Sequence, residues 1–351
     1  MGSNQRPIGY EPTALTPELR APRNNFLIIE EISQIISLEL YELDCFILKC
    51  SFVPLRKGTL MTQYIGVTGI TRKDQILALQ RMFDPDPDAP KLMVGILASA
   101  KTVDGRRNKY PRQFPLATRI PELMTHIDPA RAFGLVHYSP YQLSYVSIGE
   151  WLQNGEVLEG DCEFFLDATP REIAGFGGFQ FNMPLPSRSR LRRIQRRFAY
   201  ASRAYRSVLQ FWPQQIAKLA ELIDADERDH LDPANPADVL RWHYEVTEDD
   251  PRLPFSALLL DASGGFGKPM DVSSVLAMLR SLLDDAVLSE SLQYAVAGGL
   301  CAETVPQLAP IVELYPKLSI DAQGRLRDGD DRLNLDATKR YIDAAQKLLA
   351  G

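Results

Sequence analysis

The sequence predicts a closed barrel of eight parallel strands with helices outside it, a (β/α)8 fold of the α/β class. Eight short apolar runs occur along the chain, and each is followed by a segment long enough for a helix. The length of 351 residues allows one large barrel with additions. An open doubly wound sheet would show the same alternation, but no GxGxxG motif follows the first strand, so a dinucleotide-binding sheet has little support.

The expected strands are short apolar runs bounded by turn signals. They cover residues 64–67, 92–98, 133–138, 177–182, 206–211, 255–260, 292–297 and 317–320. The expected helices carry apolar residues at steps of three and four. They cover residues 76–82, 187–202, 214–223, 239–244, 272–283, 304–314 and 335–349.

Two regions lie outside this regular pattern. Residues 1–24 are polar and rich in proline, and residues 26–54 are apolar without a clear period, so we expect a partly disordered N-terminal extension over residues 1–60. Such an extension would cover part of the barrel, which we place at residues 61–351, or the surface of a partner protein. Residues 101–113 and 224–254 predict enlarged connections.

Composition and charge exclude several classes of protein. The net charge of -6 gives no general attraction to nucleic acid or to a membrane surface. The four cysteines form no CxxC pair and the four histidines form no metal-binding pattern, so we expect neither a metal nor a cofactor. No apolar run approaches the roughly 18 residues of a membrane span, and no signal peptide is visible, so we expect a cytoplasmic protein.

Asp261 stands where the sixth strand should end, and a glycine-rich turn follows it. A carboxylate at the carboxyl end of a strand, beside a turn that brings backbone close to a ligand, is typical of an α/β active site. The turn contains Gly264, Gly265, Gly267 and Lys268. The alternative is a tight connection in which Asp261 caps the next helix.

Three motifs together resemble the phosphoribosylanthranilate isomerase family. Val67-Thr68-Gly69-Ile70-Thr71 resembles its first-strand motif, and Leu259-Leu260-Asp261 with the glycine-rich turn resembles its sixth-strand motif. Ala297-Gly298-Gly299-Leu300 resembles its phosphate loop, and the segment from Asp321 to Gly324 resembles the end of its last strand. The resemblance extends over roughly residues 64–349 and implies a phosphate-binding TIM barrel.

This resemblance implies an Amadori rearrangement of a phosphorylated pentose or its arylamine conjugate. A general acid protonates the ring oxygen of the sugar and a general base removes a proton from the adjacent carbon. Asp261 matches the family's acid, whereas Thr68 stands where the family has its catalytic cysteine. An alcohol needs a partner to lose its proton, so the base is either Asp321 or His137.

The resemblance also implies which residues bind the substrate. Gly298 and Gly299 match the phosphate-binding backbone, and Gly324 follows the eighth strand. The glycine-rich turn and Lys268 would contact the substrate. Arg107 lies in the basic loop after the second strand, where an arginine could hold a second anionic group.

Two other functions remain open at this level. A barrel that has lost catalysis could serve as a binding or scaffold protein with a partner at the N-terminal extension. The arginine-rich helix at residues 187–202 could bind nucleic acid, although such a helix lies outside a barrel and is more often solvated.

Overall fold

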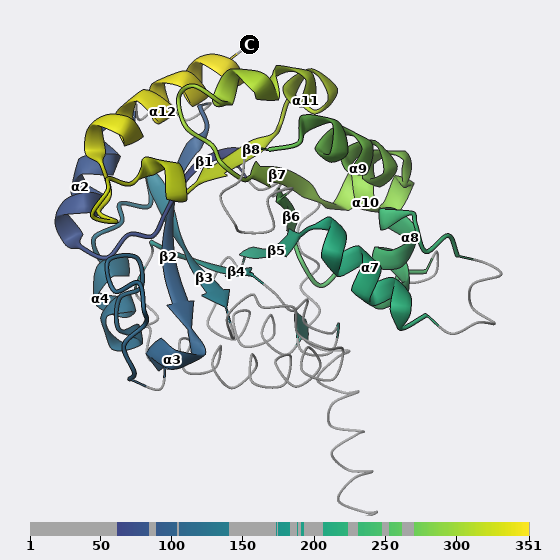
Figure 1. Cartoon of the computed structure of the whole chain (residues 1–351), viewed down its shortest axis with the longest axis horizontal. Coiled ribbons are helices and arrows are strands. Elements are labelled where there is room, and N and C mark those ends of the chain that lie inside the picture. Colours follow the sequence, from purple (N-terminus) through teal and green to yellow (C-terminus); the bar gives the residue numbers. More distant parts are fainter. Residues whose placement is uncertain are drawn as a thin grey trace, which may run out of the picture. The chain divides into compact units, whose positions relative to one another are not determined.

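The computed structural model describes residues 62–83, 89–103, 105–139, 173, 175–182, 188, 191–192, 206–223, 231–247, 253–261 and 270–350. These residues form a closed barrel of eight parallel strands (Figure 1). Each strand pairs with the next, and β1 also pairs with β8, for example through Ile65 and Ile320. Because the sheet closes on itself, the predicted barrel is confirmed and the open sheet is excluded.

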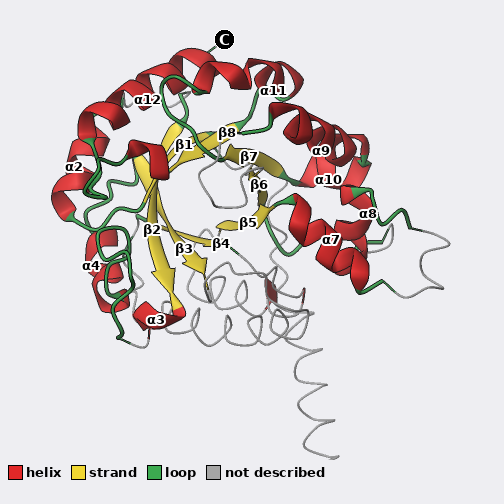
Figure 2. Ribbon diagram, viewed as in Figure 1, coloured by secondary structure: helices red, strands yellow, loops and turns green. Residues whose placement is uncertain are grey.

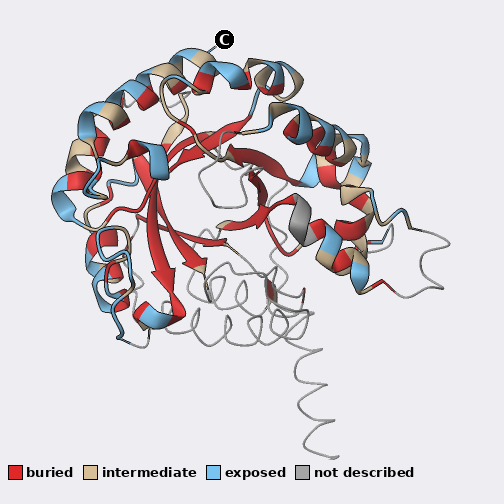
Figure 3. Cartoon of the chain, viewed as in Figure 1, coloured by how far each residue is buried: buried red, intermediate tan, exposed pale blue. Residues whose placement is uncertain are grey.

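The strands lie close to their predicted positions. They are β1 (Tyr64–Thr68), β2 (Lys91–Ser99), β3 (Ala132–Ser139), β4 (Phe176–Phe181), β5 (Arg206–Phe211), β6 (Ala257–Asp261), β7 (Gln293–Ala297) and β8 (Ser319–Ala322). Nearly every strand residue is buried, as Figure 3 shows, because the lumen covers one face of the sheet and helices cover the other. This two-sided burial explains why the strands read as continuous apolar runs.

The helices surround the strands in Figure 2. They are α2 (Lys73–Arg81), α3 (Ala100–Val103), α4 (Ile120–Met124), α7 (Pro213–Glu221), α8 (Pro236–His243), α9 (Val272–Asp284), α10 (Ala286–Ser291), α11 (Ala309–Leu314) and α12 (Leu335–Leu349). Within the described ranges the short 3-10 helices are η1 (Ala117–Arg119), η3 (Val305–Leu308) and η4 (Gly324–Leu326). The prediction for residues 335–349 is confirmed to the residue.

Some elements differ from their predictions. The helix expected over residues 304–314 is divided into η3 and α11, and each piece has a proline near its start, Pro306 and Pro310. Proline fits the first turn of a helix but interrupts a helix that reaches it from the N-terminal side. The helix α10 was not predicted, and it is capped by Asp285, whose side chain accepts a hydrogen bond from Leu288 N at 2.9 Å.

Several predictions fall outside the described residues. They concern the N-terminal extension and most of the arginine-rich segment over residues 187–202.

Side chains alternate along each strand between the lumen and the helices. On β6, Ala257 and Leu259 belong to a buried apolar cluster with residues of other strands, whereas Leu258 and Leu260 belong to the cluster that includes the helices. The first cluster fills the lumen with Tyr64, Met93, Phe133, Leu135, Val208, Ala257, Leu259 and Ala295. The barrel is therefore a packed core, and a ligand could enter only at its ends.

Candidate active site

Polar side chains replace this apolar packing at the carboxyl end of the barrel. On β6 the alternation that turns Leu259 into the lumen also turns Asp261 inward, two residues further along. The same reasoning holds for inward positions on five other strands, because their neighbours on the strand belong to the cluster that includes the helices. The inward polar residues are Thr68, His137, Gln180, Gln210, Asp261 and Asp321, and each is at most 6% exposed.

Asp321 and Thr68 are joined by a hydrogen bond across the barrel's closing seam. The Thr68 hydroxyl lies 2.9 Å from Oδ1 and 3.1 Å from Oδ2 of Asp321, so it donates to this carboxylate. The two residues lie 253 positions apart in the sequence. Of the two candidate bases, Asp321 therefore makes the shorter contact with the residue at the family's cysteine position.

The surroundings of Asp321 raise its pKa. Burial is the largest cause, because it disfavours the charged carboxylate, and the charge of Asp261 acts in the same direction. The hydrogen bond from Thr68 acts in the opposite direction, and the resulting pKa is about 7. A carboxyl group with this pKa exists in both protonation states near neutral pH, as a general base or acid must.

Asp261 and Asp321 lie at the same end of the barrel, on strands separated by β7. In the strand register Asp261 pairs with Ala297, and Ala297 pairs with Asp321. Two inward residues separated by one strand have Cα atoms roughly 9–10 Å apart, given about 4.8 Å between neighbouring strands. The two carboxyl groups therefore point into the same end of the lumen from strands separated only by β7.

Gln210 on β5 holds the second carboxylate. Its amide Nε2 donates to Oδ2 of Asp261 at 2.7 Å. Among the described helices, the next one after Asp261 is α9, and Asp271 caps it by accepting from Ser274 N at 3.2 Å. The sequence interpretation did not select Gln210, although a single glutamine at an inward position of an otherwise apolar strand was the available signal.

His137 completes the contacts around Thr68. Its Nδ1 lies 3.4 Å from the Thr68 hydroxyl oxygen and 4.0 Å from Oδ2 of Asp321. Burial lowers the pKa of His137 to about 3, because the cation would lose its hydration. A histidine that is neutral at physiological pH is a hydrogen-bonding group here, and Asp321 is the better candidate for the base.

Two glycines leave room for these polar side chains. A Cβ at Gly95 would lie 2.1 Å from the Thr68 hydroxyl oxygen and 3.0 Å from Cε1 of His137. A Cβ at Gly66 would lie 2.6 Å from Oδ1 of Asp321. Inward positions on β1 and β2 therefore lack side chains where Thr68, His137 and Asp321 meet.

Arg327, which the sequence interpretation also missed, fixes the loop above Thr68. Its side chain is 4% exposed, and Nη2 donates to the backbone oxygens of Gly69 at 2.7 Å and Thr68 at 3.3 Å. Its Nη1 donates to the oxygens of Asp331 at 3.1 Å and Arg112 at 3.4 Å. One guanidinium thus joins the segments that follow β1, β2 and β8.

The predicted phosphate-binding glycines lie in adjacent turns. Gly298 and Gly299 follow β7 with φ values of 114° and 63°, which favour glycine. The Thr304 hydroxyl fixes this turn, because it donates to Gly299 O at 3.0 Å and accepts from Cys301 N at 2.9 Å. Gly324 follows the neighbouring strand β8, is exposed, and has no atom within 4 Å of where a Cβ would be.

The remaining predicted ligand contacts are not brought to this cluster by any described contact. Arg107 is exposed in the loop after β2. Gly264, Gly265, Gly267 and Lys268 lie outside the described residues. Their predicted roles therefore stay predictions.

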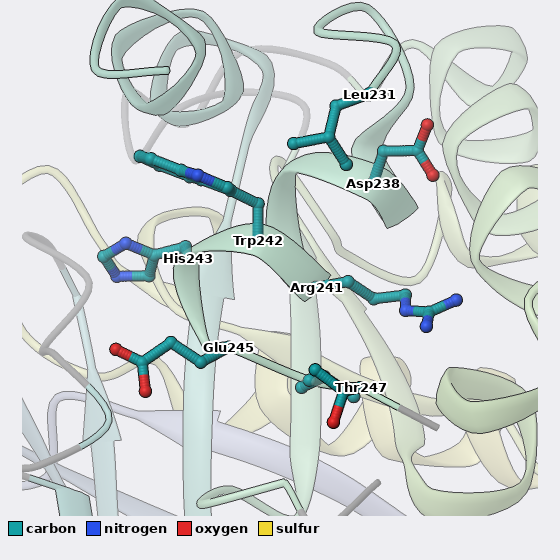
Figure 4. A pocket seen from close by; sticks show the side chains of 8 residues that line it. Leu231, Asp238, Arg241, Trp242, His243, Glu245 and Thr247 are labelled. Carbon is teal, nitrogen blue, oxygen red and sulfur yellow. The ribbon is translucent and has the colours of Figure 1, made fainter. Parts of the chain in front are cut away.

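A cavity of about 650 Å³ lies elsewhere, around α8 and the segment that leads from it to β6 (Figure 4). Leu231, Asp238, Arg241 and Trp242 are among its lining residues. Arg241 also forms an ion pair with Asp285 at 3.1 Å. Because this segment enters the amino end of a strand, the cavity is separate from the carboxyl-end cluster.

Two features are absent from the part of the chain that the structure describes. No helix there is long and apolar enough to cross a membrane. No group of three or more histidine, cysteine, aspartate or glutamate side chains there is arranged to hold a metal ion.

No protein family matches this sequence, and no curated protein does. Monomers of dimeric phosphoribosylanthranilate isomerase from Thermotoga maritima match in structure at 10% identity and a TM-score of 0.42, over 81% of this chain and 99% of that chain. Octameric Rubisco from Pyrococcus horikoshii matches at 11% identity and a TM-score of 0.46, over 83% of this chain and 61% of that chain. The catalytic domain of a family GH18 chitinase from the fern Peteris ryukyuensis matches at 11% identity and a TM-score of 0.43, over 82% of this chain and 100% of that chain.

Similarity this low carries no information about activity. The fold and the side chains define a TIM barrel with two buried carboxyl groups at its carboxyl end. The resemblance to the isomerase family stays a prediction from three sequence motifs.

Proposed function

We propose that the protein is an enzyme that catalyses proton transfer, with Asp321 as general base and Asp261 as general acid, and that the two carboxyl groups hold one proton between them. The observation that carries this proposal is the buried Asp321, whose pKa is about 7 and which shares this end of the barrel with a second buried carboxyl group. Such a pair can remove a proton from one atom of a ligand and deliver one to another.

For the substrate we propose a phosphorylated pentose or its arylamine conjugate, rearranged by an isomerase of the intramolecular oxidoreductase type. The motif resemblance supports this class, and so do the adjacent glycine turns after β7 and β8, the usual phosphate position in such barrels. The rearrangement needs a base at the carbon next to the anomeric centre and an acid at the ring oxygen. Asp321 would supply the base that a threonine at position 68 cannot.

The test is solvent-deuterium exchange into a panel of phosphopentoses and arylamine conjugates, followed by mass spectrometry. We expect one deuteron to enter the carbon next to the carbonyl group of the product. The variants Asp321→Asn and Asp261→Asn should each lower kcat by about 10²- to 10⁴-fold, the usual contribution of a general acid or base. The exposed Asp336→Asn variant is the control for loss of a charge and should retain full activity.

The rate should also fall as the pH rises above about 7, because the pair then loses the one proton that the acid must deliver. Full activity of Asp321→Asn on a substrate that the wild type converts would contradict the assignment of the base. Absence of exchange with every compound, while one of them binds, would favour a binding or scaffold function for the barrel.

A further inference from the structure

His137 is buried in the mouth of the barrel, and the proposed acid and base do not use it. Its side chain is 1% exposed and lies beside the Thr68 hydroxyl, which in turn contacts Asp321. Among the described residues, Nε2 of His137 has no hydrogen-bond partner. A buried nitrogen without a partner is costly, so this atom calls for a function.

We propose that Asp321, Thr68 and His137 form a proton relay, in which Nε2 of His137 is the end that exchanges a proton with an oxygen of the ligand. The chemical role depends on the function proposed above, but the relay itself does not. Asp321 would thereby reach two positions of a ligand, one directly and one through His137.

The direction of the hydrogen bonds follows from the number of protons. A hydroxyl has one hydrogen, so when Thr68 donates to ionised Asp321 its oxygen accepts from Nδ1–H of His137. Neutral imidazole then carries no proton on Nε2. When Asp321 is protonated it donates to Thr68, Thr68 donates to a bare Nδ1, and the histidine carries its proton on Nε2 instead.

A complete transfer conserves every proton. The carboxyl proton of Asp321 moves to the Thr68 oxygen, the former hydroxyl proton of Thr68 moves to Nδ1, and the proton on Nε2 moves to a ligand oxygen. Thr68 and His137 each end with the number of protons they had at the start, and no atom is oxidised or reduced. The 3.4 Å between Thr68 Oγ1 and Nδ1 is long for a hydrogen bond, and active-site contacts often shorten when a substrate binds.

The groups around Asp321 support a change of tautomer instead of a change of charge on His137. Burial holds the pKa of His137 at about 3, so the ring stays neutral above pH 5. Burial also raises the pKa values of Tyr64 on β1 and Tyr341 on α12, so both stay neutral. The charged groups nearby are Asp261 on β6, which raises the pKa of Asp321, and Arg327, which is bound to the Thr68 carbonyl.

The ligand group at Nε2 should be a hydroxyl or a carbonyl oxygen. Only an atom that can both donate and accept hydrogen bonds, or gain and lose a proton, matches a nitrogen that does the same. Gln180 pairs with His137 in the strand register, and its Oε1 is also without a partner among the described residues. A ligand with adjacent hydroxyl groups, such as a sugar, would fit both.

The test is ¹⁵N NMR of the full-length protein with labelled histidine, recorded from pH 5 to pH 9. The signals of His137 are assigned by their loss in the His137→Gln variant. We expect the proton to move from Nε2 to Nδ1 as the pH rises through the pKa of Asp321, with no cationic form. The Asp321→Asn variant should keep one tautomer at every pH.

Variants of threonine separate the relay from a general effect of pH. Thr68→Val should abolish the transition and Thr68→Ser should preserve it, because only serine retains the hydroxyl. Thr338→Val is the control, because Thr338 is buried on α12 and its hydroxyl donates to Asn334 O at 2.7 Å. A wild-type His137 that keeps one tautomer over the whole range would overturn the relay, and so would a transition that persists in Thr68→Val.

The outcomes also separate the relay from the proposed function. A tautomer transition in a protein without isomerase activity would leave the relay standing and remove the isomerase. Full activity with a fixed tautomer would remove the relay alone.

Discussion

At the scale of single residues, the cluster of Thr68, His137 and Asp321 depends on neighbouring glycines, which leave space for its side chains. Gly95 lies on β2 where a Cβ would come within 2.1 Å of the Thr68 hydroxyl oxygen, a distance that no real contact tolerates. Thr68 is 1% exposed and hydrogen-bonded to Asp321, so its side chain has no free space into which it could move away from an added methyl group. A small residue at this position is therefore a condition for the cluster to form.

We predict that Gly95→Ala lowers the free energy of unfolding by about 1–3 kcal/mol, the usual cost of overpacking a buried site. The matched control is Gly324→Ala, because a Cβ there would meet no atom within 4 Å and should change stability by less than about 0.5 kcal/mol. Urea denaturation at pH 7 measures both. Equal stabilities of the two variants would show that the cluster adapts to the methyl group.

At the scale of elements, one arginine holds the segments above β1. The four backbone oxygens bound by Arg327 come from the ends of β1 and from the loops after β2 and β8. The same loops also meet through Gln113, which donates to Asp331 Oδ1 and accepts from Gln323 Nε2 at 2.7 Å. These loops should therefore open as one unit.

We predict that Arg327→Met costs roughly 3 kcal/mol of stability, because buried carbonyl oxygens lose charged donors. Arg325→Met is the control, since Arg325 is exposed on the 3-10 helix η4, which ends just before Arg327. Hydrogen exchange should accelerate in residues 105–116 and 327–333 together in the Arg327 variant only. Faster exchange in just one of the two segments would contradict the single unit.

The strands were predictable because a strand that is buried on both faces has apolar residues at consecutive positions. The split between η3 and α11 and the short helix α10 were not, because apolar spacing alone does not show where Pro310 or the Asp285 cap interrupts a helix. Strand ends pointed to Asp261, Thr68 and Asp321. The bond between Thr68 and Asp321 depends on closure of the barrel across 253 positions, which no local pattern contains.

At the scale of the whole molecule, His137 and Asp321 impose opposite pH dependences on stability. The pKa of Asp321 is raised to about 7, so the folded protein holds a proton that the unfolded chain releases above about pH 4, and stability falls as the pH rises from about 4 to 7. The pKa of His137 is lowered to about 3, so the unfolded chain binds a proton that the folded protein does not. Its contribution rises with pH from about 3 to 6.5.

Between about pH 4.5 and 6 these two contributions nearly cancel in the wild type, since each changes by about 1.4 kcal/mol per pH unit. We predict that, from pH 4.5 to pH 6, the free energy of unfolding of Asp321→Asn rises by roughly 2 kcal/mol relative to wild type. Over the same interval that of His137→Gln should fall by a similar amount. Urea unfolding at pH 4.5 and 6 measures the differences, with the exposed Asp336→Asn as control. If the free energy of unfolding changes equally between pH 4.5 and 6 in wild type and both variants, neither group has a shifted pKa. The assignment of Asp321 as base would then lose its main support.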